Sequence, residues 1–156
     1  MPSPANIWSS DSFGNPKDEF MPGDTVYVTV PKTGQDVRLY VVVDKAVWNN
    51  GDPLIDVSDG YESLKLETGT GTQTIQIWAP PLMIGSYDIV MDVDCDGVFD
   101  SGKDQVDSML ITGFFVVPEV PFGTLTILIL MLISMAIHRL YSEFKSSKKR
   151  LQLAEL

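Results

Sequence analysis

The residues best suited to chemistry lie in one short acidic run. It reads Asp92-Val-Asp-Cys-Asp-Gly-Val-Phe-Asp100, with carboxylates at its first, third, fifth and ninth positions and a glycine at the sixth. Carboxylates at loop positions 1, 3 and 5, followed by a glycine that allows a sharp turn, are the pattern of calcium loops of the EF-hand type. Because like charges repel one another, the spacing predicts a cation bound between them.

The predicted calcium site draws all of its ligands from this acidic stretch. The candidate ligands are Asp92, Asp94, Asp96, Val98, Asp100, Asp104 and Asp107. Val98 would bind through its backbone carbonyl, and Asp100 directly or through a water molecule. An EF-hand has a bidentate acid at position 12, where this chain has Lys103, so Asp104 or Asp107 is left to complete the shell. Many carboxylate donors favour calcium over magnesium. The alternative is a solvated acidic turn, since aspartate and glycine both favour turns.

The inventory of reactive residues excludes several kinds of site. The chain has one cysteine, Cys95, and one histidine, His138, which lies far along the sequence from the acidic run. An intramolecular disulfide, a Ser-His-Asp or Cys-His site and a histidine-based zinc site in the first part of the chain are therefore excluded. A hydrolase with paired aspartates stays open, but no acid and base pair stands out from the loop. We therefore expect a protein that is not an enzyme.

The charge of the chain changes sign along its length. Through Glu119 there are nineteen acidic and six basic residues, whereas from Val120 onward there are five basic and two acidic ones. An acidic domain repels phosphate groups, which argues against a nucleic-acid partner, and it suits divalent cations.

The acidic run lies between two predicted strands of an all-β domain. Alternating and β-branched patterns predict strands over residues 25–30, 37–43, 72–78, 87–93 and 109–117. Turn-forming clusters separate these strands, and no helical period is sustained before residue 120. This spacing predicts an immunoglobulin-like antiparallel β-sandwich over residues 1–117, with the acidic loop at one end of it. The aromatic residues expected in its core are Trp8, Phe13, Trp48 and Trp78.

Residues 118–138 are predicted to form a single transmembrane helix with a proline-containing entry. The eighteen residues from Val120 to Ile137 carry no charge, and as a helix they would span about 27 Å of a hydrocarbon core ~30 Å thick. Basic residues dominate the tail over 139–156, which places the tail in the cytoplasm and residues 1–117 outside. The expected location is therefore the cell membrane, in a single pass. Since no signal peptide is visible at the start, a tail-anchored protein with a cytoplasmic sandwich is the alternative.

Parts of the chain resemble archaeal cell-surface proteins. The run Val117-Pro-Glu-Val-Pro-Phe-Gly-Thr124, with the apolar stretch and basic cluster after it, is similar to C-terminal sorting signals of the VPxxxP and PEF types. Residues 7–18 and 85–100 resemble recurring pieces of methanogen surface domains. The resemblance implies a secreted immunoglobulin-like module that is retained at the membrane or processed by an archaeosortase-like transpeptidase. The tail from Arg139 onward is longer than in such signals, which favours a permanent anchor.

These observations lead to one expected function and one alternative. We expect a membrane-anchored structural or adhesion protein of the cell surface, with a calcium-stabilised β-sandwich as its ectodomain. The alternative is an accessory subunit of a membrane protein complex that caps the outer face of the complex. The expected partners are membrane lipid, envelope proteins or subunits of such a complex, and an archaeosortase-like processing enzyme.

Overall fold

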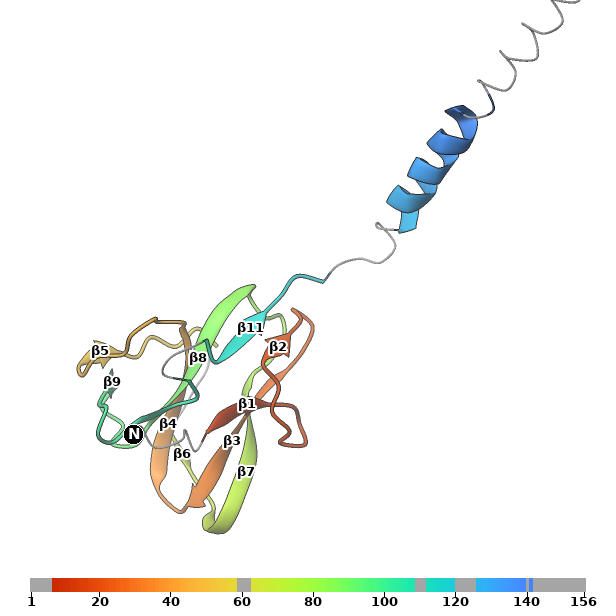
Figure 1. The fold of residues 1–156 in the computed structure, drawn as a ribbon. Coiled ribbons are helices and arrows are strands. Elements are labelled where there is room, and N and C mark those ends of the chain that lie inside the picture. The colour runs from red at the N-terminus through yellow and green to blue at the C-terminus, as the bar shows by residue number, and fades with distance from the viewer. Residues whose placement is uncertain (1–6, 59–62, 109–111, 120–125, 140, 142–156) are drawn as a thin grey trace, which may run out of the picture. The chain divides into compact units, whose positions relative to one another are not determined.

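The computed structural model describes residues 7–58, 63–108, 112–119, 126–139 and 141. The chain divides into two compact units, Met1–Glu119 and Val120–Leu156, and each is considered by itself. The first unit is built mainly of β-strands (Figure 1). These are β1 (Trp8–Ser10), β2 (Glu19–Phe20), β3 (Val26–Thr33), β4 (Asp36–Val43), β5 (Asp52–Pro53), β6 (Leu64–Lys65), β7 (Thr68–Trp78), β8 (Gly85–Asp92), β9 (Val98–Phe99), β10 (Gln105–Val106) and β11 (Phe114–Val116).

The strands form two larger sheets and one small pair. One sheet has the order β1-β3-β7, and the other has the order β2-β11-β8-β4-β6, with β10 also paired to β8. β5 and β9 pair with each other apart from both sheets. The pairings are antiparallel except that of β2 with β11, which is parallel. The prediction of a largely antiparallel, mostly-β domain is therefore confirmed.

The main hydrophobic core gathers side chains from both larger sheets. Val26, Val28 and Val30 of β3 are fully buried, as the alternation of that strand predicts. From the other sheet, β4 and β8 contribute Val37, Leu39, Val41, Tyr87, Ile89 and Met91. Two sheets that bury their inner faces against each other are consistent with a β-sandwich.

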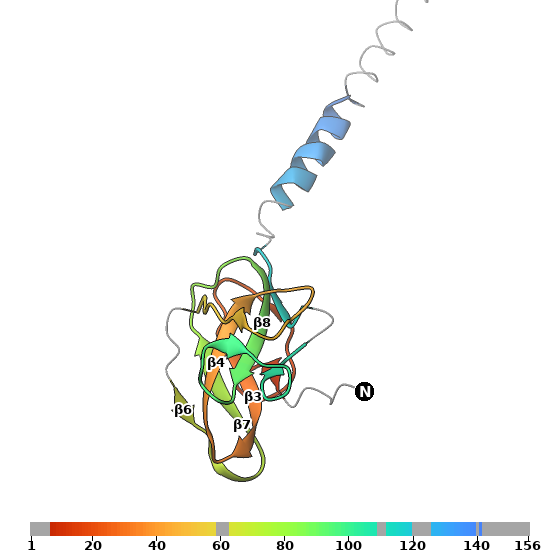
Figure 2. The ribbon, with the colours of Figure 1, turned by 90° about the vertical axis from the view of Figure 1, so that its left-hand side faces the viewer.

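A second, smaller core lies on the opposite face of β4 and β8. Its members are Val42, Trp48, Leu54, Val90, Phe99 and Val106. Figure 2 looks onto this face, where the segment after β4 and the acidic loop cover the two strands. We call these two segments the cover. The ring of Trp48 in the first segment packs against the ring of Phe99 in the second, with their centroids 5.1 Å apart. β8 is consequently buried on both of its faces.

The first unit has a hydrophobic interior of its own. The buried apolar residues of the described chain all lie between Ile7 and Val116. A domain with a complete core can fold without the rest of its chain, so residues 1–119 form an independent folding unit.

The expected aromatic core is correct for two residues and wrong for one. Trp48 and Trp78 are buried, and Trp8 is partly buried, but Phe13 is 88% exposed. The side chain of Asp11 accepts hydrogen bonds from the backbone N–H groups of Phe13 and Asn15, which fixes a tight turn after β1. The Phe13 ring therefore points to solvent. Residues 109–111 of the last predicted strand lie outside the described residues.

In the second unit, residues 126–139 and 141 are helical. Among the residues that the structure describes, no helix is both long and apolar enough to cross a membrane. The predicted transmembrane helix over 118–138 is therefore wrong, and so is the location as a single-pass protein of the cell membrane. Residues 120–125 and nearly all of the predicted tail lie outside the described residues.

Candidate metal centre

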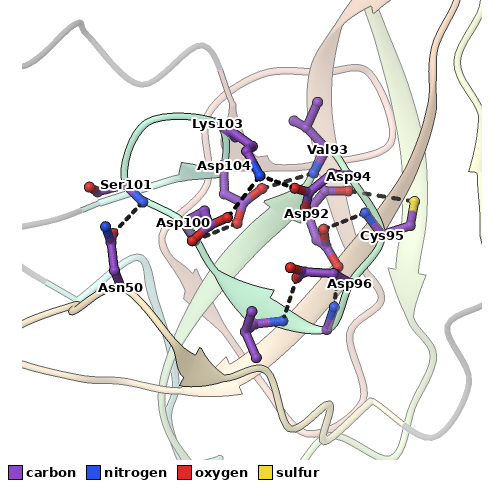
Figure 3. Close-up of polar contacts among 12 residues, drawn as sticks. Asn50, Asp92, Val93, Asp94, Cys95, Asp96, Asp100, Ser101, Lys103 and Asp104 are labelled. Atoms are coloured by element: carbon purple, nitrogen blue, oxygen red, sulfur yellow. Dashed lines mark hydrogen bonds and ion pairs between the residues drawn. The ribbon is translucent and has the colours of Figure 1, made fainter.

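The acidic run begins where β8 ends. Asp92 is the last residue of β8 and is fully buried, whereas Asp94 and Asp96 are exposed. One carboxylate oxygen from each of these three residues lies within 4.8 Å of the others. Figure 3 shows the three side chains grouped at the turn. We refer to Asp92, Asp94 and Asp96 as the loop cluster.

Backbone hydrogen bonds to Asp92 explain why the cluster forms. Its two carboxylate oxygens accept the N–H groups of Cys95, at 2.7 Å, and of Gly97, at 3.0 Å. Cys95 and Gly97 have φ angles of 60° and 84°, and these left-handed conformations curl the chain back toward Asp92. Gly97 adopts its angle without steric cost, which is the role that the calcium-loop pattern assigns to a glycine at the sixth position.

Lys103 supplies a positive charge beside the loop cluster. Its ammonium group contacts Asp94 Oδ2 and lies 3.0 Å from Asp100 Oδ2 (Figure 3). The hydrogen bond from Lys103 lowers the pKa of Asp94, and the two carboxylates raise the pKa of Lys103. Position 12 of the loop thus carries a cation where an EF-hand carries an acid.

Asp104 closes the base of the loop. Its Oδ1 accepts the N–H of Val93 at 2.9 Å, and its Oδ2 accepts the N–H of Asp100 at 2.7 Å. Asp104 is only 9% exposed, and this burial raises the pKa of its carboxyl group. Because both oxygens receive backbone amides, Asp104 holds the two ends of the loop together and lies outside the loop cluster.

Two further predicted ligands lie close to the turn. Val98 belongs to β9 and is paired with Pro53, which has no N–H to donate to the Val98 carbonyl. Asp100 follows β9 and contacts Lys103. A hydrogen bond of 2.8 Å from the Ser101 N–H to the Asn50 side chain ties this part of the loop to the segment after β4.

Asp107 lies apart from the loop cluster. Its Oδ1 accepts the N–H groups of Ile89 and Ser108, at 3.0 and 2.9 Å. Its Oδ2 is buried and has no hydrogen-bond partner among the described residues. Burial raises the pKa of Asp107 well above the ordinary carboxyl value, and nearby Asp88 adds to this shift. Gly113 packs so closely that a Cβ there would lie 2.2 Å from Asp107 Oδ2.

Asp88 is a buried acid that the motif analysis did not single out. Its carboxylate accepts hydrogen bonds from Trp48 Nε1 at 2.9 Å, from the Gly113 N–H at 3.1 Å and from the Lys45 N–H at 3.3 Å. Burial raises the pKa of Asp88, and the hydrogen bond from Trp48 opposes this shift. Its position in the sequence could have indicated it. Asp88 lies four residues before Asp92 in the predicted strand, and so on the same face of that strand. We refer to Asp88 and Asp107 as the buried pair.

The loop cluster has the donor chemistry of a hard divalent cation. Calcium takes six to eight oxygen ligands, so three carboxylates give a partial shell. The Val98 carbonyl, Asp100 and water are the candidates for the remaining positions. No protein-family model, no curated protein and no solved structure matches this chain. The resemblance to archaeal cell-surface proteins, with the sorting signal and processing enzyme that it implies, therefore stays a prediction.

Proposed function

We propose that the first unit is an immunoglobulin-like β-sandwich that binds calcium at the loop cluster and serves as a structural or adhesion module. The observation that carries this proposal is the convergence of three carboxylate oxygens within 4.8 Å. Lys103 contacts only one member of the cluster, Asp94. A divalent cation at the cluster offsets the charges that Lys103 leaves unpaired, among them the charge of the buried Asp92.

The proposed role of the ion is to hold the cover over β8 in place. The loop continues from the cluster into β9, which pairs with β5 in the segment after β4. Phe99 of β9 packs against Trp48, so the same loop carries part of the second core. An ion that fixes the turn therefore stabilises the packing on the outer face of β8.

Thermal unfolding of residues 1–119, with calcium and with chelator, tests this proposal. A ligand that binds only the folded state at about 100 times its dissociation constant should raise the midpoint by roughly 10 °C. Asp94→Asn and Asp96→Asn should abolish the increase, because each removes a charged donor of the loop cluster. Glu19→Gln is the matched control, since Glu19 is exposed and no hydrogen bond or ion pair of its side chain is found among the described residues. A midpoint that does not respond to millimolar calcium would reject the calcium site.

A further inference from the structure

β7 leaves a long sheet edge open. It is the longest described strand, with 11 residues, and β3 pairs with one of its sides. No strand in the described part of the chain pairs with its other side, which lies at the margin of the sheet in Figure 1. The other strands at the sheet margins are short: β1 has three residues, and β2 and β6 have two each. β4 extends beyond β6, and there Val41 already forms hydrogen bonds with Asp56 and Val57.

The open edge presents backbone groups that are ready to pair. Among the described residues, no backbone hydrogen bond outside the β3–β7 ladder involves residues 69–78. The register with β3 is continuous from Thr72 to Gln76. Gly69 and Gly71, with φ angles of 151° and 91°, break the regular geometry before this stretch. A regular row of unpaired N–H and C=O groups is a template for another strand.

β7 has no charged residue or proline that would protect its edge, and the irregularities of its pairing with β3 lie outside the regular stretch from Thr72 to Gln76. Natural edges are commonly guarded by charged side chains, prolines or inward-turning bulges. Between Thr68 and Trp78 there is no charged residue and no proline, although the whole chain carries a net charge of −10. The exposed side chains of the regular stretch are those of Thr72 and Gln76, both polar and neutral.

We propose that two copies of this chain pair through β7, antiparallel and across a two-fold axis, so that their sheets become one continuous sheet. A two-fold axis places identical strands antiparallel, and each contact then occurs twice. Acidic domains repel each other, and an uncharged strand is where two copies can meet without opposing like charges. Two-fold pairing uses the open β7 edge of both copies, so the assembly closes as a dimer. The dimer does not depend on the proposed calcium site.

Analytical ultracentrifugation of residues 1–119 over a range of concentrations tests the dimer. The wild-type domain should pass from monomer to dimer as the concentration rises. The double variant Thr72→Lys/Gln76→Lys should stay monomeric, because lysines on an edge strand meet each other across the axis. Both substitutions reduce the net negative charge, so general repulsion between domains falls. Dissociation of the dimer would therefore be specific to the edge.

The double variant Val47→Lys/Ile55→Lys is the matched control. Both side chains are exposed, at 65% and 69%, and lie in the segment that follows β4, so the charge change is the same on another surface. This control should dimerise like the wild type. Hydrogen exchange followed by mass spectrometry adds a readout without mutation, since amides 72–78 should exchange more slowly at high concentration. The proposal is overturned by a monomer at all concentrations, by growth beyond the dimer, or by a dimer that survives both lysines in β7. It is overturned equally if the control dissociates or if protection of 72–78 does not depend on concentration.

Discussion

The loop cluster and the buried pair compensate their negative charge in different ways. Asp88 of the buried pair lies beneath the second core and accepts three hydrogen bonds, one of them from Trp48 Nε1. Asp107, beside it, accepts two backbone amides and keeps one buried oxygen without a partner among the described residues. At the end of the same strand, Asp94 is exposed and contacts the ammonium group of Lys103.

The difference shows that the surroundings of an aspartate determine how its negative charge is neutralised. Burial raises the pKa of both Asp88 and Asp107, so a proton can neutralise the buried pair. In the loop cluster, Lys103 instead lowers the pKa of Asp94, which keeps that carboxylate ionised. Carboxylates that lie close together at an exposed turn favour a bound cation, and this is why we propose calcium at the loop cluster and not at the buried pair.

The largest expected effect comes from breaking the buried pair at Asp88. Asp88→Ala leaves three donors without their acceptor, those of Trp48, Lys45 and Gly113. The donors of Trp48 and Gly113 are buried, and each one left unsatisfied costs about 1–3 kcal/mol, so the free energy of unfolding should fall by about 2 kcal/mol or more. Urea unfolding measures the loss, and Glu19→Ala on the surface should change stability by no more than about 0.5 kcal/mol. If Asp88→Ala and Glu19→Ala lower the free energy of unfolding equally, the hydrogen bonds to Asp88 do not stabilise the domain.

An intermediate effect is expected from the charge beside the loop cluster. Lys103→Glu replaces the cation at position 12 with the acid that an EF-hand has there, and calcium affinity should rise about tenfold. Lys103→Met removes the positive charge without adding an oxygen ligand, so its affinity should fall between those of Lys103→Glu and the wild type. Isothermal titration calorimetry with calcium gives the three dissociation constants. If all three agree, Lys103 and calcium do not compete for the loop cluster.

The smallest expected effect concerns the protonation of Asp107. Its pKa is 3.8 when unperturbed and well above that in the folded domain. The stabilisation by protonated Asp107 is therefore complete at a pH below its pKa in the unfolded state. It is lost as the pH rises through its pKa in the folded state. Asp107→Asn does not titrate, so it should be the more stable protein at alkaline pH, by about 1 kcal/mol, and lose this advantage in acid. Urea unfolding from acid to alkaline pH measures the difference in stability between Asp107→Asn and the wild type. A difference that does not change with pH would show that Asp107 has the same pKa in the folded and unfolded states.

Local patterns were sufficient to predict the class of fold and the centre of the candidate site. The alternation of Val26, Val28 and Val30 identified a strand with one buried face, because side chains on a strand alternate between faces. The spacing of the loop cluster and the position of Gly97 identified the turn, since a turn is set by a few consecutive residues.

Features that depend on distant residues were not predictable in this way. Trp48 donates a hydrogen bond to Asp88 although 40 residues separate them. No local pattern in the sequence indicates that the outer face of β8 is covered. For the same reason, the spacing of the acidic run includes Asp107 among the candidate ligands, whereas its carboxyl group accepts the N–H of Ile89. The apolar run after Val120 was long enough for a membrane span, but composition alone does not determine the length of a helix, and no helix among the described residues is long and apolar enough to cross a membrane.

The parallel pairing of β2 with β11 has a mechanical consequence. β2 lies near the start of the domain and β11 is its last strand, and they run in the same direction. Tension between the start of β2 and the end of β11 therefore pulls these strands lengthwise past each other. The hydrogen bonds from Phe115 N–H to Asp18 O and from Val117 N–H to Phe20 O then bear the load together. The first unit therefore resists shear at its last strand.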